Sequence, residues 1–179
     1  NNGVSISKTV IGTGSAQGVT LTANDVASLG NGTIQVSAVQ NDAAGNAQNA
    51  FPATTSFVLD TASPRIQSVA ISSSAGSDST YTTGDVIAIS INLDENTTVD
   101  TSGGTPRIGI DIGGSTVYAD YVSGSGSSTL LFEYTVQAGD LDSVGIAILA
   151  NSLDANGGSL TDGEGNIASL NHLGLPDNA

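Results

Sequence analysis

The sequence predicts an all-β protein made of two β-sandwich domains in line. Apolar residues alternate with polar ones over many short stretches, as they do in half-buried strands. Gly-rich turn signals separate these stretches at intervals of about ten residues. The apolar residues are mostly Val, Ile, Leu and Ala among Thr, Ser and Gly, a mixture that favours strands and turns. We place the domains at residues 1–61 and 62–179 and find no amphipathic-helix pattern.

The first domain has few strands for a sandwich, which usually needs about seven. Its expected strands centre on Val4–Val10, Val19–Leu21, Ile34–Ala38 and Phe57–Leu59, with turns at Gly12–Gly14, Asn31–Gly32 and Gly45–Asn46. We interpret this domain as incomplete, with a sheet edge that needs a neighbour.

The second domain has a fuller set of strands with clear alternation. The expected strands are Ile87–Leu93, Ile108–Ile112, Val117–Val122, Leu130–Val136 and Ile146–Ile148, and the hairpin-type turns are Gly103–Gly104 and Gly113–Gly114. We expect the strand at Ile87 to end at Leu93, so that Asp94 and Glu95 begin a loop. The strand spacing and the Gly-rich turns favour a β-sandwich.

A short stop separates the two domains. Phe57 and Leu59 end one strand, Ile66 and Val69 lie in the next, and Pro64 fixes the backbone between them. We interpret residues 60–64 as a stiff joint and Asp60 as a candidate metal ligand. For Asp60 taken alone, a solvated turn residue is the simpler reading.

The charge balance is strongly acidic, with 17 acids against three bases and a net charge of −14. This excludes a nucleic-acid backbone or an anionic membrane as partner, because both need Lys and Arg. Acidic residues without bases repel one another unless cations neutralise them, and oxygen-rich Ca²⁺ sites would do so. The alternatives are a protein kept soluble by its charge or one from a high-salt habitat.

The chain contains no Cys, which excludes disulfides and thiolate metal sites. We see no apolar stretch long enough to cross a membrane and no signal peptide. We therefore interpret the chain as a mature product or an excised piece, stabilised by its core and by metal.

The two halves share an internal pattern, which indicates an array of repeats. Leu21–Gly30 followed by Asp42–Asn46 corresponds to Val136–Gly145 followed by Asp162–Asn166, and each half carries a strand between its two motifs. A match at this level of detail is unlike chance similarity of composition.

These motifs carry a family resemblance. Leu21–Gly30, Asp42–Asn46 and Leu59–Pro64 resemble the C-terminal part of a bacterial immunoglobulin-like repeat. The second half is similar to cadherin-like repeats in the same class of giant calcium-dependent surface adhesins, which includes repeats-in-toxin adhesins and biofilm-associated proteins. The stretches that carry this second similarity are Tyr81–Asp85, Gly103–Pro106, Tyr121–Gly126 and Tyr134–Asp140.

The resemblance implies an extracellular segment at a bacterial cell surface, built of immunoglobulin-like and cadherin-like sandwiches and stabilised by calcium. Its partners would be neighbouring repeats or subunits, with a surface glycan or protein as a further candidate. The first domain lacks the N-terminal strands of such a repeat. Asp140 and Asp142 stand where related repeats often carry a denser acidic run.

The topology of a β-sandwich predicts at which end of its domain each acidic residue lies. Because the last strand of a domain runs toward the next domain, the loop before that strand lies at the opposite pole. On this argument one junction gathers oxygen ligands suited to Ca²⁺, from Asp25, Asp60, Asp94, Glu95, Asp162 and Asn166. Asp42 would face whatever precedes residue 1, and Asp140 and Asp142 would bind metal at the following joint.

Each of these residues also has a purely structural reading. Asp42 and Asp162 fit turns in which the Asp side chain accepts backbone hydrogen bonds. Asp25 fits a helix cap for Val26–Leu29, and Asp140 and Asp142 fit the same role. Asp94 and Glu95 fit a solvated loop tip.

An enzyme is disfavoured, because His172 is the only histidine and has no partner at a catalytic spacing. Tryptophan is absent and aromatics make up 4% of the chain, which argues against a glycosidase cleft. We expect a structural segment with calcium at the joint. The alternatives are a sugar- or peptide-binding module, for which Tyr118 or Tyr121 would be exposed, and a filament or surface-layer subunit completed by a neighbour's strand.

Overall fold

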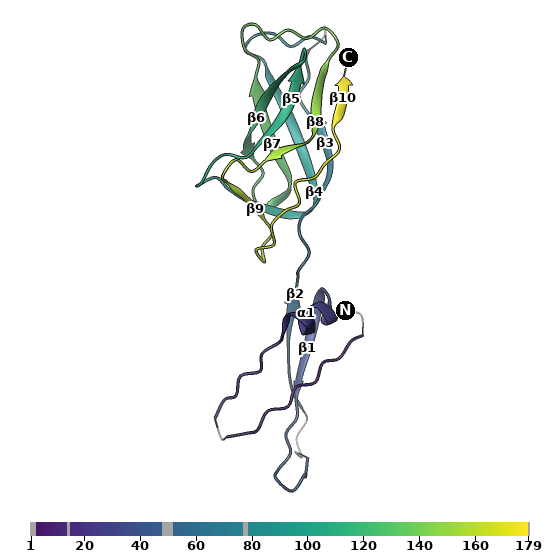
Figure 1. Cartoon of the computed structure of the whole chain (residues 1–179), viewed down its shortest axis with the longest axis vertical. Coiled ribbons are helices and arrows are strands. Elements are labelled where there is room, and N and C mark those ends of the chain that lie inside the picture. The colour runs from purple at the N-terminus through teal and green to yellow at the C-terminus, as the bar shows by residue number, and fades with distance from the viewer. Residues whose placement is uncertain (1–2, 14, 48–51, 77–78, 179) are drawn as a thin grey trace. The chain divides into compact units, whose positions relative to one another are not determined.

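The structure is a computed structural model that describes residues 3–13, 15–47, 52–76 and 79–178 (Figure 1). The chain divides into two compact units, Asn1–Ala62 and Ser63–Ala179. Strands are the main regular structure of the chain, and the described residues contain one short helix. The all-β prediction is therefore confirmed. None of the helical residues described forms a segment with the length and apolar character needed to span a bilayer.

Unit 1 consists of a helix and a two-stranded antiparallel sheet. Helix α1 spans Ala23–Leu29, and strand β1 (Gly32–Ala38) pairs with β2 (Ala53–Leu59) along their whole length. Leu29 and Ile34 are the buried apolar residues described in this unit. Such a small core stabilises the unit by only a few kcal/mol, at about 1.5–3 kcal/mol for each buried side chain.

The helix begins earlier than the sequence predicted. Thr22 is its N-cap and forms a capping box with Asp25: Thr22 Oγ1 accepts from the Asp25 N–H at 3.2 Å, and Asp25 Oδ2 accepts from the Thr22 N–H at 2.7 Å. Asp25 therefore lies in the first helical turn of Ala23–Leu29: the predicted helix start at Val26 is wrong, whereas the expected acceptance of a backbone N–H by Asp25 at the helix N-terminus is confirmed. A Thr three residues before an acid supplies both halves of this motif.

Two of the four strands expected in unit 1 are not formed. Residues Val4–Val10 and Val19–Leu21 have no strand structure, and Val4, Val10 and Val19 are 41%, 50% and 53% exposed. Alternation alone does not make a strand, because backbone groups need a partner ladder. Of the predicted turn at Gly12–Gly14, Gly14 lies outside the described residues.

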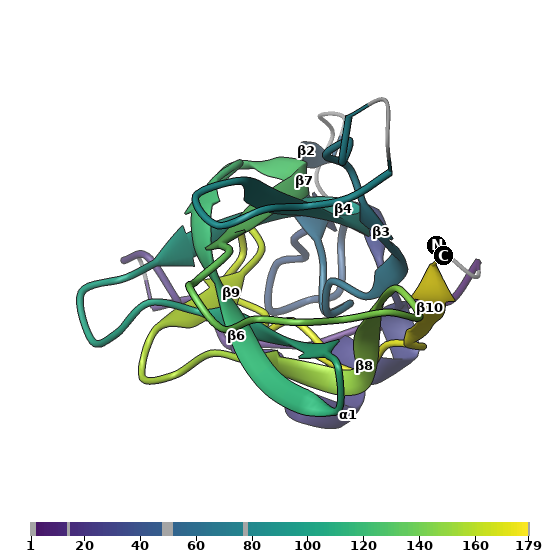
Figure 2. The ribbon, with the colours of Figure 1, turned by 90° about the horizontal axis from the view of Figure 1, so that it is seen from above.

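Unit 2 is one strongly curved antiparallel sheet that nearly closes into a barrel. Its strands follow the order β10-β8-β5-β6-β7-β4-β3, with β9 paired to the far part of β4. Viewed along the strands in Figure 2, β3, β4 and β7 lie on one side of the unit, and β6, β8 and β10 on the other. The strands are β3 (Ile66–Ile71), β4 (Val86–Asp100), β5 (Arg107–Ile112), β6 (Ser115–Ser123), β7 (Ser127–Thr135), β8 (Ile146–Asp154), β9 (Ser159–Thr161) and β10 (Leu175–Asn178).

The core of unit 2 comes from the alternating residues that the sequence singled out. Side chains from β4, β5, β7 and β8 meet inside the curved sheet and are almost completely buried: Ile87, Ile89, Ile91, Ile108, Ile110, Leu130, Phe132 and Ile148. The rings of Tyr121 and Phe132 pack edge to face with centroids 5.7 Å apart. This core makes unit 2 far better packed than unit 1.

Strand β4 is longer than predicted. It runs through Asp94 and Glu95 to Asp100, and its register against β7 shifts between Asn92 and Thr97. The expectation that the strand ends at Leu93 is therefore wrong. The β-branched residues after Glu95 support an extended strand, and Thr97 is fully buried. The irregular stretch around Glu95 re-aims side chains, as bulges do.

The two Gly-Gly turns differ. Gly113 and Gly114, with φ of 59° and 85°, form the tight hairpin that joins the paired strands β5 and β6, as predicted. Gly103 and Gly104 also form a turn, closed by the Gly104 N–H on the Thr101 carbonyl at 3.2 Å. This turn joins β4 to β5, which do not pair, so the prediction of a hairpin there is wrong.

Candidate metal centre

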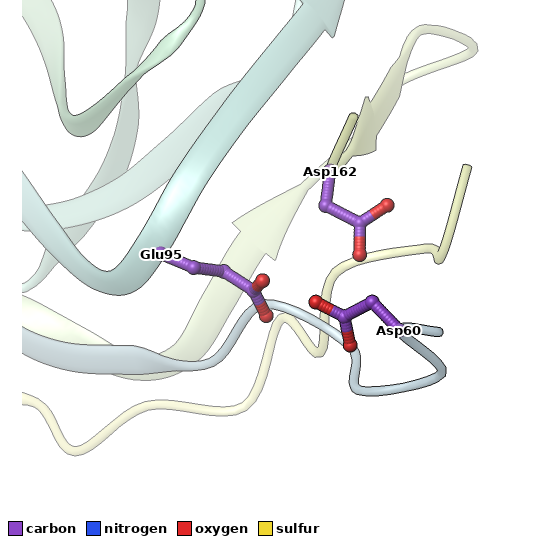
Figure 3. A group of neighbouring side chains, drawn as sticks. All are labelled: Asp60, Glu95 and Asp162. Carbon is purple, nitrogen blue, oxygen red and sulfur yellow. The ribbon is translucent and has the colours of Figure 1, made fainter. Parts of the chain in front are cut away.

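Three carboxylates from distant parts of the sequence form one group. Asp60 follows β2, Glu95 lies in the irregular stretch of β4, and Asp162 directly follows β9. One oxygen from each lies within 4.8 Å of the others, and Figure 3 shows the three side chains converging. Asp162 is 5% exposed and the other two are half-buried. Among the described residues, this is the only group of three or more potential Asp, Glu, His or Cys ligands.

Asp162 is held by its own loop, Asp162–Asn166. Its Oδ1 accepts the N–H groups of Glu164 at 2.9 Å and Asn166 at 2.8 Å, and its Oδ2 accepts from Asn166 Nδ2 at 2.7 Å. Burial raises the pKa of Asp162, but the hydrogen bonds from Asn166, Glu164 and Gly165 together outweigh burial, so the net pKa is lowered. The loop thus keeps a buried carboxylate ionised without a basic side chain.

Asp60 is oriented by a residue that the sequence analysis did not select. Its Oδ1 accepts from Asn31 Nδ2 at 2.7 Å and from the Ala62 N–H at 2.9 Å. Asn31 Oδ1 in turn accepts from the N–H and hydroxyl of Thr61, at 3.0 and 2.8 Å. The sequence indicates Asn31 only as part of the Asn31–Gly32 turn. Its link to Asp60 is not recognisable from sequence spacing.

Asp94 and Glu95 have different roles although they are neighbours. Asp94 Oδ1 accepts the Arg65 N–H at 2.7 Å, and the Asp94 N–H donates to the Arg65 carbonyl at 3.0 Å. Asp94 therefore fastens the start of unit 2, while Glu95 joins the carboxylate group. Successive residues of an extended strand point to opposite sides, which separates the two side chains.

The three carboxylates repel one another, and a cation bound among them would offset that repulsion. Two like charges 4 Å apart repel by about 1 kcal/mol in water and about 4 kcal/mol near a protein surface. The basic side chains that form ion pairs in the described part of the chain are engaged elsewhere: Lys8 with Asp25 at 2.6 Å and Arg107 with Asp154 at 3.2 Å. Carboxylate oxygens on irregular backbone are the kind of ligand that Ca²⁺ prefers.

The structure places Asp25 and Asp42 outside this group. Asp25 accepts from Thr22 and pairs with Lys8, and the Lys8 ammonium together with the Thr22 bonds lowers the Asp25 pKa to about 2. Asp42 forms a loop with the same bonds as Asp162, accepting from Ala44 N–H at 2.9 Å, Asn46 N–H at 2.8 Å and Asn46 Nδ2 at 2.7 Å. Hydrogen bonds from the side chain and backbone of Asn46 lower the Asp42 pKa.

Asp140 and Asp142 lie together at an open pocket of about 570 Å³ in unit 2. Asp140 accepts from the Tyr134 hydroxyl and the Gln137 N–H, each at 2.8 Å. Asp142 accepts from three backbone N–H groups, those of Gly113, Val144 and Gly145, and these bonds lower its pKa. Burial and the nearby Asp140 raise the Tyr134 pKa. Both carboxylates thus shape loops in this structure.

Of the two tyrosines expected to be exposed in a sugar- or peptide-binding module, one is exposed. Tyr118 is 43% exposed, but the guanidinium of Arg107 lies 4.3 Å above its ring centroid. Tyr121 packs inward on Phe132, and its hydroxyl accepts the Ser125 N–H at 2.8 Å. Arg107 thus covers one face of the Tyr118 ring.

Comparisons with protein-family models, with curated proteins and with solved structures find no match for this chain. Function is therefore inferred from the residues and their geometry.

Proposed function

We propose that this chain is a calcium-stabilised structural extender segment of a secreted bacterial surface adhesin. The observation that carries the proposal is the convergence of Asp60, Glu95 and Asp162 within 4.8 Å. These residues offer an all-oxygen ligand set, which suits Ca²⁺ better than the strict octahedron that Mg²⁺ demands. Bound calcium would hold the segment around Asp60 to β4 and to the loop after β9.

The composition supports a structural role. The net charge of −14 disfavours folding through self-repulsion, and bound divalent cations would offset part of that cost. Unit 2 has a continuous apolar core, which supports a role as a stable spacer. The repeated Asp42–Asn46 and Asp162–Asn166 loops support an array in which like units follow one another.

We further propose that the units are an incomplete immunoglobulin-like domain and a cadherin-like domain of such an array. The motif resemblance supports this assignment, as do the antiparallel strands of both units. The expected setting is extracellular, at a cell surface or in a biofilm, with neighbouring repeats as partners and cell adhesion as the biological role.

One observation favours a second candidate, a filament or surface-layer subunit completed by a neighbour's strand. The two-stranded sheet of unit 1 leaves Val36, Phe57 and Val58 at 40%, 41% and 71% exposed. A sheet of two strands is marginal by itself, and an added strand would cover this surface. Mass measurement at increasing concentration separates the two candidates, because strand exchange produces oligomers and an extender unit stays monomeric.

Thermal unfolding with defined metal content tests the calcium proposal. Calcium at 100 times its dissociation constant stabilises the folded state by about 2.7 kcal/mol, because a ligand of the folded state adds stability by mass action. We expect EDTA to lower the melting temperature and calcium, but not magnesium at equal concentration, to restore it. Unfolding that is indifferent to EDTA and calcium would overturn the proposal and leave a β protein kept soluble by its charge.

A further inference from the structure

The single histidine of the chain is buried in unit 2 and accepts hydrogen bonds from backbone. His172 is 7% exposed, and its Nε2 lies 3.1 Å from the Ser152 nitrogen and 3.2 Å from the Leu153 nitrogen. Its Nδ1 lies 2.8 Å from the Leu173 carbonyl oxygen. Since two N–H groups point at Nε2 and a carbonyl faces Nδ1, the hydrogen sits on Nδ1 and the ring is neutral.

The imidazole ring accepts hydrogen bonds from an irregular part of strand β8. The register of β8 against β5 shifts between Ile108 and Ile110, and the Ser152 hydroxyl donates to the carbonyls of Leu149 at 2.7 Å and Gly109 at 3.0 Å. At this point the N–H groups of Ser152 and Leu153 are taken up by the imidazole of His172. Without that acceptor, two backbone donors would lie unpaired in a largely buried place.

His172 also joins the last strand to β8. Its N–H donates to Asn151 Oδ1 at 3.0 Å, and its carbonyl accepts the Asn151 N–H at 3.1 Å. Gly174 then passes so close to β8 that a Cβ there would lie 2.5 Å from the Ile148 carbonyl oxygen. Strand β10 begins at the next residue, Leu175, which pairs with Ile148. The imidazole therefore fastens the segment that positions β10.

We propose that His172 is an acid-sensitive fastener whose protonation releases β10 from β8. A protonated ring carries hydrogen on both nitrogens, so Nε2 would face two N–H donors and accept from neither. An imidazole in water takes up a proton near pH 6.5. The closed form keeps the ring neutral and the opened form binds the proton, so falling pH favours the opened form.

The surroundings of the ring supply no competing charge. A groove of about 580 Å³ runs beside it, and all other lining residues described there are uncharged, from Ile66–Val69 of β3 to Ala150, Asn151, Asn171, Leu173 and Gly174. The charged groups on the adjoining elements are engaged or exposed: Arg107 with Asp154, Asp111 with the Gly114 N–H, and exposed Arg65 and Asp177.

The amino-acid composition allows an effect of His172 protonation to be distinguished from the titration of other side chains. The chain has one His and no Cys, so between pH 7.5 and 5.5 no other side chain passes through its ordinary titration range. Release would open the groove beside β3 on its β10 side. The proposal does not depend on calcium binding, because His172 is absent from the carboxylate group.

Hydrogen exchange of the full chain tests the proposal, with rates corrected for the intrinsic pH dependence. From pH 7.5 to 5.5 we expect the protection of the Ser152 and Leu153 amides and of β10 to fall about tenfold, because protonation of an imidazole exposed to water favours the opened form over this range. Amides of the β4–β7 ladder should keep their protection. Unchanged protection at Ser152 and Leu153 would overturn the proposal.

The matched variant is His172→Gln, whose amide oxygen can accept the same two N–H groups and does not titrate in this range. We expect the pH dependence to vanish in this variant, and an undiminished tenfold change would overturn the assignment to His172. Should the variant not fold, the ring ¹⁵N shifts of the wild-type protein decide. At pH 7.5 they should report the tautomer with hydrogen on Nδ1, and the opposite tautomer would contradict the geometry.

Discussion

Asn166 donates its side-chain N–H to Oδ2 of Asp162 at 2.7 Å, across a loop of five residues. The corresponding loop of unit 1 has the same bond at the same length, from Asn46 to Asp42. In both loops the Asp also accepts the Asn backbone N–H at 2.8 Å. The loops differ in burial, since Asp162 is 5% exposed whereas Asp42 is exposed. One local motif is thus present in two environments, which makes it possible to measure how burial changes the contribution of the Asn–Asp hydrogen bond to stability.

Replacing the amide donor should therefore cost more in unit 2 than in unit 1. Removing one partner of a hydrogen bond leaves a buried group unsatisfied, whereas water replaces the lost partner of an exposed group. We expect Asn166→Ala to lower the unfolding free energy of unit 2 by the larger amount in urea titrations. Asn46→Ala is the matched control in unit 1. Equal losses in the two variants would show that the burial of Asp162 does not strengthen the bond.

Glu95 and Glu164 provide a charge-matched pair for the calcium proposal. Glu95 belongs to the carboxylate group, whereas Glu164 is exposed in the adjacent loop and uses its backbone N–H there. Removing one ligand charge at this range costs about 1–4 kcal/mol, and each 1.4 kcal/mol is tenfold in affinity. We expect calorimetry to show at least about tenfold weaker calcium binding for Glu95→Gln and little change for Glu164→Gln. A similar loss in both would indicate diffuse attraction by net charge.

Asp60 tests whether calcium orders the segment that joins the units. The chain has no Cys, so spin labels at Ser56→Cys and Ser123→Cys are unambiguous, and both positions are exposed. On the calcium proposal, adding the ion narrows the distance distribution between these labels, and Asp60→Ala abolishes the narrowing. The melting of unit 2 should change less, because its isoleucine core does not include residue 60. Full narrowing in Asp60→Ala would contradict the role of Asp60, and a distribution that is already narrow in both proteins without calcium would assign the stiffness to Pro64 and side-chain packing.

Lys8 should control the titration of Asp25. The Asp25 pKa is about 2, first because of the Lys8 side chain and then because of the Thr22 hydrogen bonds. A depressed pKa means that the contribution of Asp25 to stability is present above its ordinary value of 3.8 and is lost as pH falls toward 2. We expect Lys8→Met to raise the Asp25 pKa toward 3.8 in carboxyl NMR titrations. A value that stays near 2 would assign the shift to the capping box alone.

Local features of the fold were predictable from sequence. The alternation at Ile87–Leu93 and Leu130–Phe132 identified core strands, because side chains of a strand alternate between its faces. The Gly113–Gly114 hairpin was predictable because its positive φ angles suit Gly. The same reasoning failed at Val4–Val10, for which the described residues provide no partner strand, and at Leu93, where β4 continues beyond the acids.

The candidate site likewise has features that were predictable from the sequence and features that were not. The Asp162–Asn166 turn is determined by its own five residues, since the Asp oxygens reach N–H groups two and four positions ahead. The expected order of the strands predicted that Asp60, Glu95 and Asp162 lie close together. It also predicted Asp25 and Asp94 in the same group, but Asp25 pairs with Lys8 and Asp94 accepts a hydrogen bond from the Arg65 backbone.

The sequence by itself determined the β character of the chain, its acid excess and its repeated Asp–Asn loops, because each depends on composition or on residues close in the chain. Tertiary structure alone decided which acids converge, since strand register sends Glu95 to the group and Asp94 away from it. It also decided the role of His172. The residue has no catalytic motif around it, but β8 presents two backbone N–H groups where its ring lies, and a pairing of strands distant in sequence makes that possible.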